Sequence, residues 1–176
     1  MSLSNTPQWV AVYTASRAEK AVTERISQDL HLETYLPLHR VLRKWSDRMK
    51  SVEVPLLPSY TFVKMTERDL YYVYDVQGVT GFVRFPSTGI ATIPQFEIDA
   101  MRRLAEADKE VYVHNTSQLR KGASVRIVAG HFEGLQGSII KDCKDGNFAV
   151  QISQLNVSLV MTIESDVLEV VPEQTE

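Results

Sequence analysis

The chain has 176 residues, of which 44% are apolar and 23% are charged, and its formal net charge is −3. A chain of this length forms one ordinary domain or two small ones. Its apolar runs are far shorter than the roughly 20 residues that a transmembrane helix needs. The first residues also lack the basic and apolar segments of a secretory signal. We therefore expect a soluble, cytoplasmic protein, and its single cysteine, Cys143, excludes an intramolecular disulfide.

The charged residues are unevenly distributed along the chain. Residues 1–115 carry equal numbers of basic and acidic side chains, so the negative excess lies in the C-terminal third. One basic cluster stands out, with Asp47 as its only acid, and it contains Arg40, Arg43, Lys44, Arg48 and Lys50. Lys and Arg supply the phosphate contacts on which nucleic-acid affinity depends. The cluster is therefore the candidate nucleic-acid site, and the acidic third is not.

The first elements predict a strand followed by a helix. Residues 9–14 are apolar on both faces, which is typical of a central strand covered on each side. Ser16 and Glu19 then form a capping-box pattern, and apolar residues recur at helical spacing as far as Leu30. Residues 34–38 predict a strand at a sheet edge, because Pro37 cannot donate a ladder hydrogen bond. The basic cluster follows this edge.

The next elements complete the first domain. Residues 52–54 and 59–63 predict the returning arm of a hairpin and a strand that rejoins the sheet. Residues 67–76 predict a second helix, residues 81–85 another strand, and Pro94 opens a third helix in a first-turn position. We expect residues 1–107 to form an α/β sandwich, with a mostly antiparallel central sheet flanked by helices.

The composition changes after residue 107. Residues 108–119 lose their periodicity and predict a linker. Five of the eight glycines fall within residues 120–172, among short β-branched runs at 125–128, 138–140, 148–152, 157–163 and 167–171. These runs predict a small, five-stranded, SH3-like β-barrel, followed by a tail at 173–176. The predicted fold class is thus α+β, with a sandwich followed by a barrel.

The chain contains no recognisable catalytic or metal-binding pattern. Its four histidines are scattered, without the partners that a zinc site requires. No nucleophile-elbow pattern is present. The glycine-rich segment at residues 130–137 has neither the spacing of a phosphate-binding loop nor that of a dinucleotide fold. We therefore predict a protein that is not an enzyme and that uses neither a metal nor a cofactor.

The glycine-rich segment resembles the KOW motif almost position for position, through Gly122, Val125, Ile127, Gly130, Phe132, Gly134 and Gly137. We expect the strand to end at Gly130 and Phe132 to plug the barrel mouth. Gly134 and Gly137 would permit a tight return with positive φ. KOW modules bind either RNA or proteins, and the acidity of this part of the chain favours a protein partner.

The N-terminal segments resemble the N-terminal (NGN) domain of NusG-type transcription factors. The matching segments are Trp-Val-Ala-Val-Tyr at 9–13, Arg-Ala-Glu-Lys at 17–20, Pro-Leu-Leu-Pro-Ser-Tyr-Thr-Phe-Val at 55–63 and Gly-Val-Thr-Gly-Phe-Val-Arg at 78–84. The family usually carries glycine where Ser59 stands. Together with residues 43–48 and 52–56, this difference resembles the UpxY-like branch, which is associated with antitermination in surface-polysaccharide operons.

The resemblance implies two contact surfaces. One is an apolar pocket for the clamp helices of the largest RNA polymerase subunits, matched or flanked by Leu57, Tyr60, Phe62, Phe82, Val83 and Phe85. Ordinary core packing is the alternative for each of these residues. Strand alternation places Tyr60 and Phe62 on one face, which makes them the favoured pair.

The second implied surface is a hairpin near the upstream DNA and the displaced strand. It would contain the five cations of the basic cluster, with Trp45 suited to stack on a base. Arg17 and Lys20 at the first helix would extend it. A solvated charged loop is the alternative, and the choice between DNA and RNA stays open.

The resulting functional prediction is a monomeric elongation regulator that binds the polymerase clamp and promotes antitermination. Its KOW barrel, which we expect to remain β-structured, would recruit a protein such as a ribosomal protein or Rho. Two alternatives remain: a housekeeping NusG that couples polymerase to Rho or the ribosome, and an RNA-binding KOW protein of the translation machinery.

Overall fold

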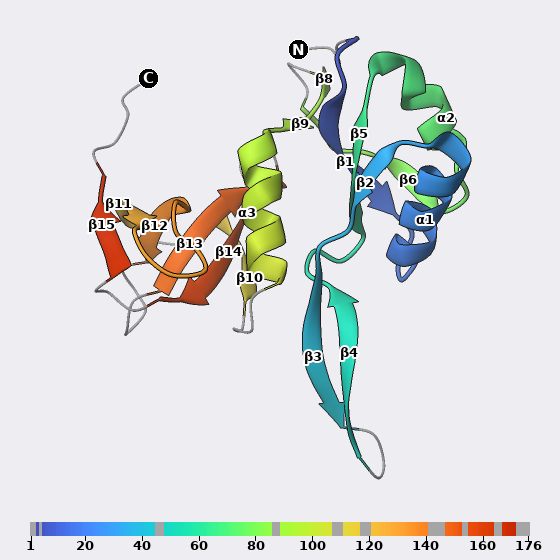
Figure 1. Ribbon diagram of the computed structural model, residues 1–176. Coiled ribbons are helices and arrows are strands. Elements are labelled where there is room, and N and C mark those ends of the chain that lie inside the picture. Colours follow the sequence, from blue (N-terminus) through green and yellow to red (C-terminus); the bar gives the residue numbers. More distant parts are fainter. Residues whose placement is uncertain are drawn as a thin grey trace. The chain divides into compact units, whose positions relative to one another are not determined.

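The computed structural model describes residues 3, 5–44, 48–85, 89–106, 111–116, 121–140, 147–152, 155–163 and 167–171. The chain divides into two compact units, Met1–Gln95 and Phe96–Glu176, whose elements are labelled in Figure 1. The predicted tail at 173–176 and parts of the predicted linker lie outside the described residues. The described part of that linker contains a strand, β10 (Tyr112–Asn115), because these residues pair with another strand of the second unit.

The first unit is built on an antiparallel sheet with the strand order β2-β5-β1-β6, in which β9 also pairs with β1. Its helices and strands are β1 (Gln8–Thr14), α1 (Glu19–Leu30), β2 (Glu33–Tyr35), β3 (Leu38–Lys44), β4 (Met49–Pro55), β5 (Tyr60–Met65), the 3₁₀ turn η1 (Glu67–Asp69), α2 (Leu70–Asp75), β6 (Val79–Phe82), β7 (Arg84–Phe85), β8 (Gly89–Ile90) and β9 (Thr92–Ile93). The prediction of a mostly antiparallel sheet is confirmed for this unit, which also contains helices.

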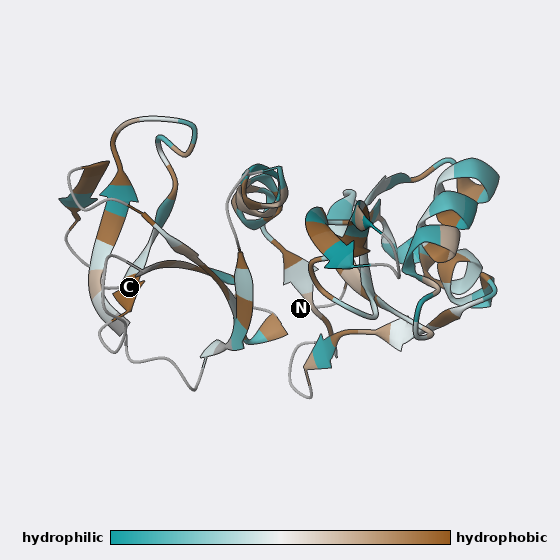
Figure 2. Ribbon diagram, turned by 90° about the horizontal axis from the view of Figure 1, so that it is seen from below, coloured by the Kyte–Doolittle hydropathy of each residue, from teal (hydrophilic) through white to brown (hydrophobic). Residues whose placement is uncertain are grey.

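Strand β1 is central, as its two apolar faces predicted. Val10, Ala11 and Val12 have no measurable exposure. One face of the sheet is covered by α1 and α2. Val22 and Ile26 of α1 and Val73 of α2 join a core with β1, β5 and β6. Apolar and hydrophilic residues alternate along α1, which leaves the side of the helix away from this core hydrophilic (Figure 2).

Strands β3 and β4 form a two-stranded sheet of their own, paired over their full length from Leu38↔Pro55 to Lys44↔Met49. This hairpin extends from the end of the five-stranded sheet of the same unit (Figure 1). At its base, the Leu56 N–H donates to the carbonyl of Pro37 over 2.7 Å. The edge strand predicted for residues 34–38 is shorter, because β2 ends at Tyr35 and a new strand begins after Pro37.

The predicted capping box at the start of α1 is wrong. The helix begins at Glu19 after Ala18, which makes no side-chain cap, and Arg17 has a left-handed φ of 63°. The Glu19 carboxylate instead accepts a hydrogen bond from the backbone N–H of Ser59 over 2.7 Å. A capping box does occur at Thr66 and Asp69, where the second helical segment starts.

Three other elements differ in detail from the prediction. The second helix is a 3₁₀ turn followed by the six residues of α2, and the strand expected at 81–85 is divided between β6 and β7. Pro94 directly precedes α3 (Gln95–Ala105) rather than lying in its first turn. Proline suits this boundary because it lacks the N–H that a helix interior would use.

The second unit contains α3 and a six-stranded antiparallel sheet with the order β10-β14-β13-β12-β11-β15. Its further strands are β11 (Lys121–Ile127), β12 (Gln136–Ile140), β13 (Asn147–Ile152), β14 (Val157–Thr162) and β15 (Leu168–Val170). Each of the five predicted runs contains a strand. The predicted count of five is wrong, because β10 adds a sixth. Within the described residues no pairing joins β10 to β15, so a closed barrel is not found.

The core of this sheet follows the period of two that its register imposes. Phe148, opposite Met161, and Val150, opposite Leu159, are all buried on one face. Ala149 and Val160 lie on the other face and pack with Ile140. Strand β12 comes so close to β13 that a Cβ at Gly137 would lie 2.7 Å from the Phe148 ring and would collide with the carbonyl of Ala149.

We expect Gly137→Ala to lower the free energy of unfolding by about 1–3 kcal/mol, because the added methyl group overpacks the β12–β13 contact. Gly134→Ala is the matched comparison, since this glycine has a φ of +86° but open space around its Cβ. It should cost only the backbone strain of about 1–2 kcal/mol. Urea titrations of both variants would measure these values. If Gly137→Ala and the parent have the same free energy of unfolding, the steric explanation is wrong.

A second prediction concerns Ser59, whose φ of 64° lies in the left-handed region that glycine adopts more readily. Glu19→Ala leaves the Ser59 N–H without its carboxylate acceptor and should cost about 1–3 kcal/mol of stability. Glu19→Gln keeps an acceptor and should cost less than half of that. Ser59→Gly should be neutral or stabilising by up to about 1 kcal/mol. If Glu19→Ala unfolds at the same urea concentration as the parent, this hydrogen bond does not stabilise the fold.

Candidate interaction surfaces

The residues predicted to form the polymerase pocket separate into a buried set and an accessible set. Leu57, Phe62, Phe82 and Val83 have at most 7% exposure. They belong to the packed interior, as the alternative of core packing anticipated. Tyr60 is half-buried and Phe85 is 38% exposed. Of the favoured pair, only Tyr60 is therefore available to a partner in this structure.

Tyr60 lies beside a residue that the sequence analysis did not select, Tyr13. The two residues are register partners across β1 and β5, their ring centroids are 5.0 Å apart, and Tyr13 is 37% exposed. Tyr13 was missed because β1 was expected to be covered on both faces. The strand alternation of residues 9–14 places Tyr13 on the same face as Trp9 and Ala11, but only the register with β5 places it beside Tyr60.

Gly81 leaves the tyrosine pair accessible on the side of β6, the neighbour of β1 opposite β5. It is the register partner of Tyr13 on β6, and no heavy atom lies within 4 Å of the position that a Cβ would take there. The strand next to Tyr13 therefore presents no side chain against its ring. We call the surface formed by Tyr13, Tyr60 and the open space at Gly81 the tyrosine patch. It is an aromatic surface with open space beside it.

Tyr60 of the tyrosine patch is uncharged at physiological pH. Burial raises the pKa of the Tyr60 phenol to about 12, and a hydrogen bond with Tyr13 and the charge of that neighbour act in the same direction. Both the burial and the phenol–phenol hydrogen bond favour the protonated form of Tyr60. The patch therefore suits an apolar partner surface with a few polar groups, rather than an ionic one.

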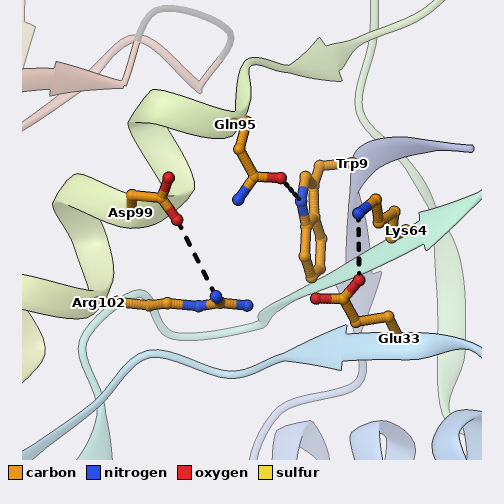
Figure 3. Close-up of polar contacts among 6 residues, drawn as sticks. All are labelled: Trp9, Glu33, Lys64, Gln95, Asp99 and Arg102. Atoms are coloured by element: carbon orange, nitrogen blue, oxygen red, sulfur yellow. Dashed lines mark hydrogen bonds and ion pairs between the residues drawn. The ribbon is translucent and has the colours of Figure 1, made fainter.

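The other end of this face of β1 is closed by polar contacts, which Figure 3 shows. The indole N–H of Trp9 donates to the Gln95 side-chain oxygen over 2.8 Å. The Lys64 ammonium lies 5.9 Å from the centre of the Trp9 ring and pairs with Glu33 at 3.2 Å. Trp9 is only 2% exposed. The accessible aromatic surface on this strand is thus confined to its Tyr13 end.

The predicted nucleic-acid residues gather on the β3–β4 hairpin. Arg40, Arg43, Lys44, Arg48 and Lys50 are all exposed on it. Trp45 lies outside the described residues. Glu53 is the one acidic side chain among the described hairpin residues, and it lies 3.8 Å from Arg40 and 3.9 Å from Lys20 on α1. The structure thus brings Lys20 to the hairpin base, whereas Arg17 lies exposed in the turn before α1.

His39 lies at the base of the hairpin and does not add to its charge. Burial lowers the pKa of its imidazole below the ordinary value of 6.5, because a desolvated ring favours the neutral form. A groove of about 330 Å³ lies nearby, between α1 and the chain leading into β3, and its wall includes Lys20, Thr23 and Leu38. The described residues contain no group of three or more His, Cys, Asp and Glu placed to hold a metal ion.

The KOW-like residues of the second unit form one continuous segment. Val125 and Ile127 on β11 are buried, and Phe132 in the following turn is 7% exposed. Gly130 and Gly134 have positive φ, as a tight return requires, and Gly134 N–H donates to the Ile127 carbonyl. Gly122 lies on β11.

Two expectations for this segment are wrong. Strand β11 ends at Ile127, before Gly130. Gly137 lies within β12 and is not among the positive-φ glycines, because its small size serves the close strand contact instead of a turn. The side chain of Arg103 on α3 also reaches this segment and donates to the Glu133 carbonyl over 2.6 Å.

No helix in the described part of the chain is long and apolar enough to cross a membrane. Among solved structures, that of NusG from Thermotoga maritima has a similar fold, with a TM-score of 0.55 at 21% sequence identity, covering 94% of this chain and 98% of that one.

Sequence comparison gives closer relationships. The transcription termination/antitermination protein NusG of Rickettsia typhi is 29% identical over 83% of this chain and 80% of its own length. That of Rickettsia prowazekii is 30% identical over 78% of this chain and 76% of its own length. The family model described as transcription termination factor NusG matches residues 7–102. The chain therefore belongs to the NusG family.

Proposed function

We propose that this chain regulates transcription elongation by binding RNA polymerase through the tyrosine patch of its first unit. The family membership supports a role in transcription, and the relatives carry names that cover both termination and antitermination. The observation that carries the polymerase contact is the pairing of Tyr13 with Tyr60 beside the open space at Gly81. Such a function places the protein in the cytoplasm and requires neither catalysis nor a cofactor.

The proposed partner is the helical clamp region of the largest polymerase subunits. Exposed tyrosines supply large contact areas at a low entropic cost and are frequent hot spots in protein interfaces. An amphipathic helix of the partner can place an apolar side chain in the space beside Tyr13 while its polar groups meet the two phenols. Binding that prefers the closed clamp would stabilise the processive state by its differential affinity.

The second unit has a separate role in this proposal. Its β-sheet carries the KOW-like segment, and we interpret it as an SH3-like module that recruits a protein such as Rho or a ribosomal protein. Residues 1–107 and 120–172 are the proposed functional domains, with α3 belonging to the polymerase-binding one, as the family match to residue 102 supports. The acidity of the C-terminal third opposes phosphate binding and supports a protein partner.

The finer proposal is antitermination in a surface-polysaccharide operon, as in the UpxY-like branch. Its support is the sequence pattern of the hairpin and the serine at position 59. Ser59 has a left-handed φ of 64°, so it keeps the conformation that a glycine would adopt most easily at this turn. The housekeeping role is the competing function, and a transcription assay separates the two.

Tyr60→Ala and Tyr13→Ala should each weaken the binding of purified core RNA polymerase by about tenfold to a hundredfold, as expected for interface hot spots. Tyr112→Ala is the matched control, because this tyrosine is 54% exposed on a strand of the other unit. Fluorescence anisotropy of the labelled intact chain would measure the affinities, with circular dichroism confirming folding. Equal affinities for all three variants would exclude the tyrosine patch as the polymerase contact.

Single-round transcription through a Rho-dependent terminator distinguishes the two regulatory roles. An antiterminator should increase read-through in the presence of Rho, because it stabilises the elongating complex. A housekeeping factor should lower read-through in the presence of Rho, because it recruits Rho. Increased termination with Rho, lost on removal of residues 120–176, would reject the antitermination proposal while leaving polymerase binding intact.

A further inference from the structure

We propose that the second unit pairs with a second copy of this chain through the outer edge of β10, in a two-fold antiparallel arrangement centred on Val113. The inference goes beyond the proposed function, because β10 contains no residue of the tyrosine patch and lies after residue 102, where the family match ends. It also departs from the monomer that the sequence analysis predicted. It concerns a strand in a segment that was expected to be a linker.

Strand β10 is one of the two outer strands of the six-stranded sheet, and β14 is its single partner strand among the described residues. Opposite residues of an antiparallel pair alternate between those that exchange hydrogen bonds and those that do not. The Thr116 N–H continues the register of this pair and donates to the carbonyl of Asn156 over 3.0 Å. The alternate residues Val113 and Asn115 therefore direct their backbone N–H and C=O groups away from β14.

This outer edge is accessible to solvent. Tyr112 is 54% exposed, Val113 is 37% exposed, and His114 is exposed as well. Backbone groups that line such an edge form a template on which another strand can pair. The edge of β10 therefore offers regular, accessible backbone to a partner strand.

The opposite edge of the same sheet shows how an outer strand is protected. Glu169 in the middle of β15 forms an ion pair with Arg126 at 2.8 Å, and Pro172 follows this strand in the sequence. Charged side chains and proline at an edge discourage pairing with another chain. Residues 111–116 contain no Asp, Glu, Lys, Arg or Pro. Strand β10 thus lacks both of these protective features.

The outer edge of β10 is complementary to itself in the antiparallel direction. A two-fold axis at Val113 sets this residue opposite the same residue of the second copy, as a pair that exchanges hydrogen bonds. By the same alternation, Asn115 of each copy exchanges hydrogen bonds with Val111 of the other. An axis at His114 would pair the outward groups of fewer residues. The register centred on Val113 is therefore favoured.

The side chains also match in this register. Val113 meets its own copy, which joins two β-branched apolar side chains. Tyr112 lies opposite His114 of the second copy, and the two-fold axis repeats this ring pair. Cross-strand pairs of these kinds stabilise a sheet, whereas like charges in opposite positions destabilise it. A second copy supplies this match without any like charge on the paired strands, which is why we choose it over a strand of another protein.

The resulting dimer should be weak. One strand pair buries less than the roughly 1,200–2,000 Å² of a stable interface, so we expect a Kd of about 10–300 μM. The C-terminal third of the chain has a negative excess, and repulsion between two copies is screened by salt. Raising the NaCl concentration should therefore strengthen the dimer, whereas a dimer held by ion pairs would weaken.

The test is sedimentation velocity of the intact chain over concentrations that span this Kd. The parent should shift from monomer to dimer. Val113→Lys should weaken association at least about tenfold, because it sets two ammonium groups opposite each other at the axis. Val170→Lys is the matched control, since Val170 is 68% exposed on the other edge strand, β15. It should dimerise like the parent, and circular dichroism would confirm that both variants fold.

Disulfide cross-linking tests the register. In a Cys143→Ser background, Val113→Cys should give a covalent dimer under mild oxidation, because opposite residues of such a pair have Cα atoms about 5.5 Å apart. His114→Cys should not cross-link, because its two copies lie diagonally across the axis at more than about 7 Å. Cross-linking through His114→Cys but not through Val113→Cys would reject the proposed axis.

Amide hydrogen exchange identifies what covers the edge. The N–H groups of Val113 and Asn115 should exchange rapidly in dilute solution and slowly in concentrated solution. Slow exchange at both concentrations would mean that the chain covers its own edge. Rapid exchange at both would leave the edge to a different protein. Either result overturns the proposal.

Two sedimentation results also overturn it: a parent chain that remains monomeric at every concentration, and a dimer that survives Val113→Lys. Polymerase affinity measured on the same preparations keeps the two proposals distinct. Val113→Lys should bind polymerase as the parent does, because it changes no residue of the tyrosine patch. A chain that binds polymerase without dimerising rejects only the β10 pairing, and one that dimerises without binding polymerase rejects only the polymerase contact.

Discussion

The pairing of β1 with three other strands is the constraint on which the first unit depends. This strand joins β5, β6 and β9, and its middle residues are fully buried, so no neighbouring element can shift without disturbing it. The register with β5 sets Tyr13 opposite Tyr60, and the register with β6 sets it opposite Gly81. The candidate polymerase surface is therefore a consequence of strand pairing, with its side chains held by the most rigid part of the fold.

The connection between Glu19 and Ser59 links the helical layer to this surface. The buried carboxylate at the start of α1 holds the N–H of a residue in a left-handed conformation, immediately before Tyr60 enters β5. The Thr14 N–H also donates to the Ser59 carbonyl over 2.9 Å. The turn that orients Tyr60 is thus fixed from both sides. Less conformational entropy of this turn is therefore lost when a partner binds there.

The hairpin differs from the sheet that carries it in what stabilises it. The sheet gains its stability from buried apolar area, whereas the hairpin holds most of its side chains in solvent and places like charges opposite one another. Such a ribbon contributes little to the free energy of folding, and a long two-stranded element of this kind is marginal by itself. The exposed side chains of the hairpin can therefore suit a charged ligand without a large loss of stability, provided that the strand pairing at its base is kept.

The sequence by itself determined the central strand, the order of helices and strands, the five strand runs of the second unit and the basic character of the hairpin, because local periodicity and charge specify these features. It also determined the family. The sequence pattern did not separate the buried Phe62 from the accessible Tyr60, since alternation gives the face of a strand and not what covers that face. Tyr13 as the partner of Tyr60, Glu19 as the ligand of the Ser59 N–H and Tyr112–Asn115 as a sixth strand all depend on residues distant in the chain. Only the tertiary structure decided them, because pairing register and burial arise from contacts that no local pattern contains.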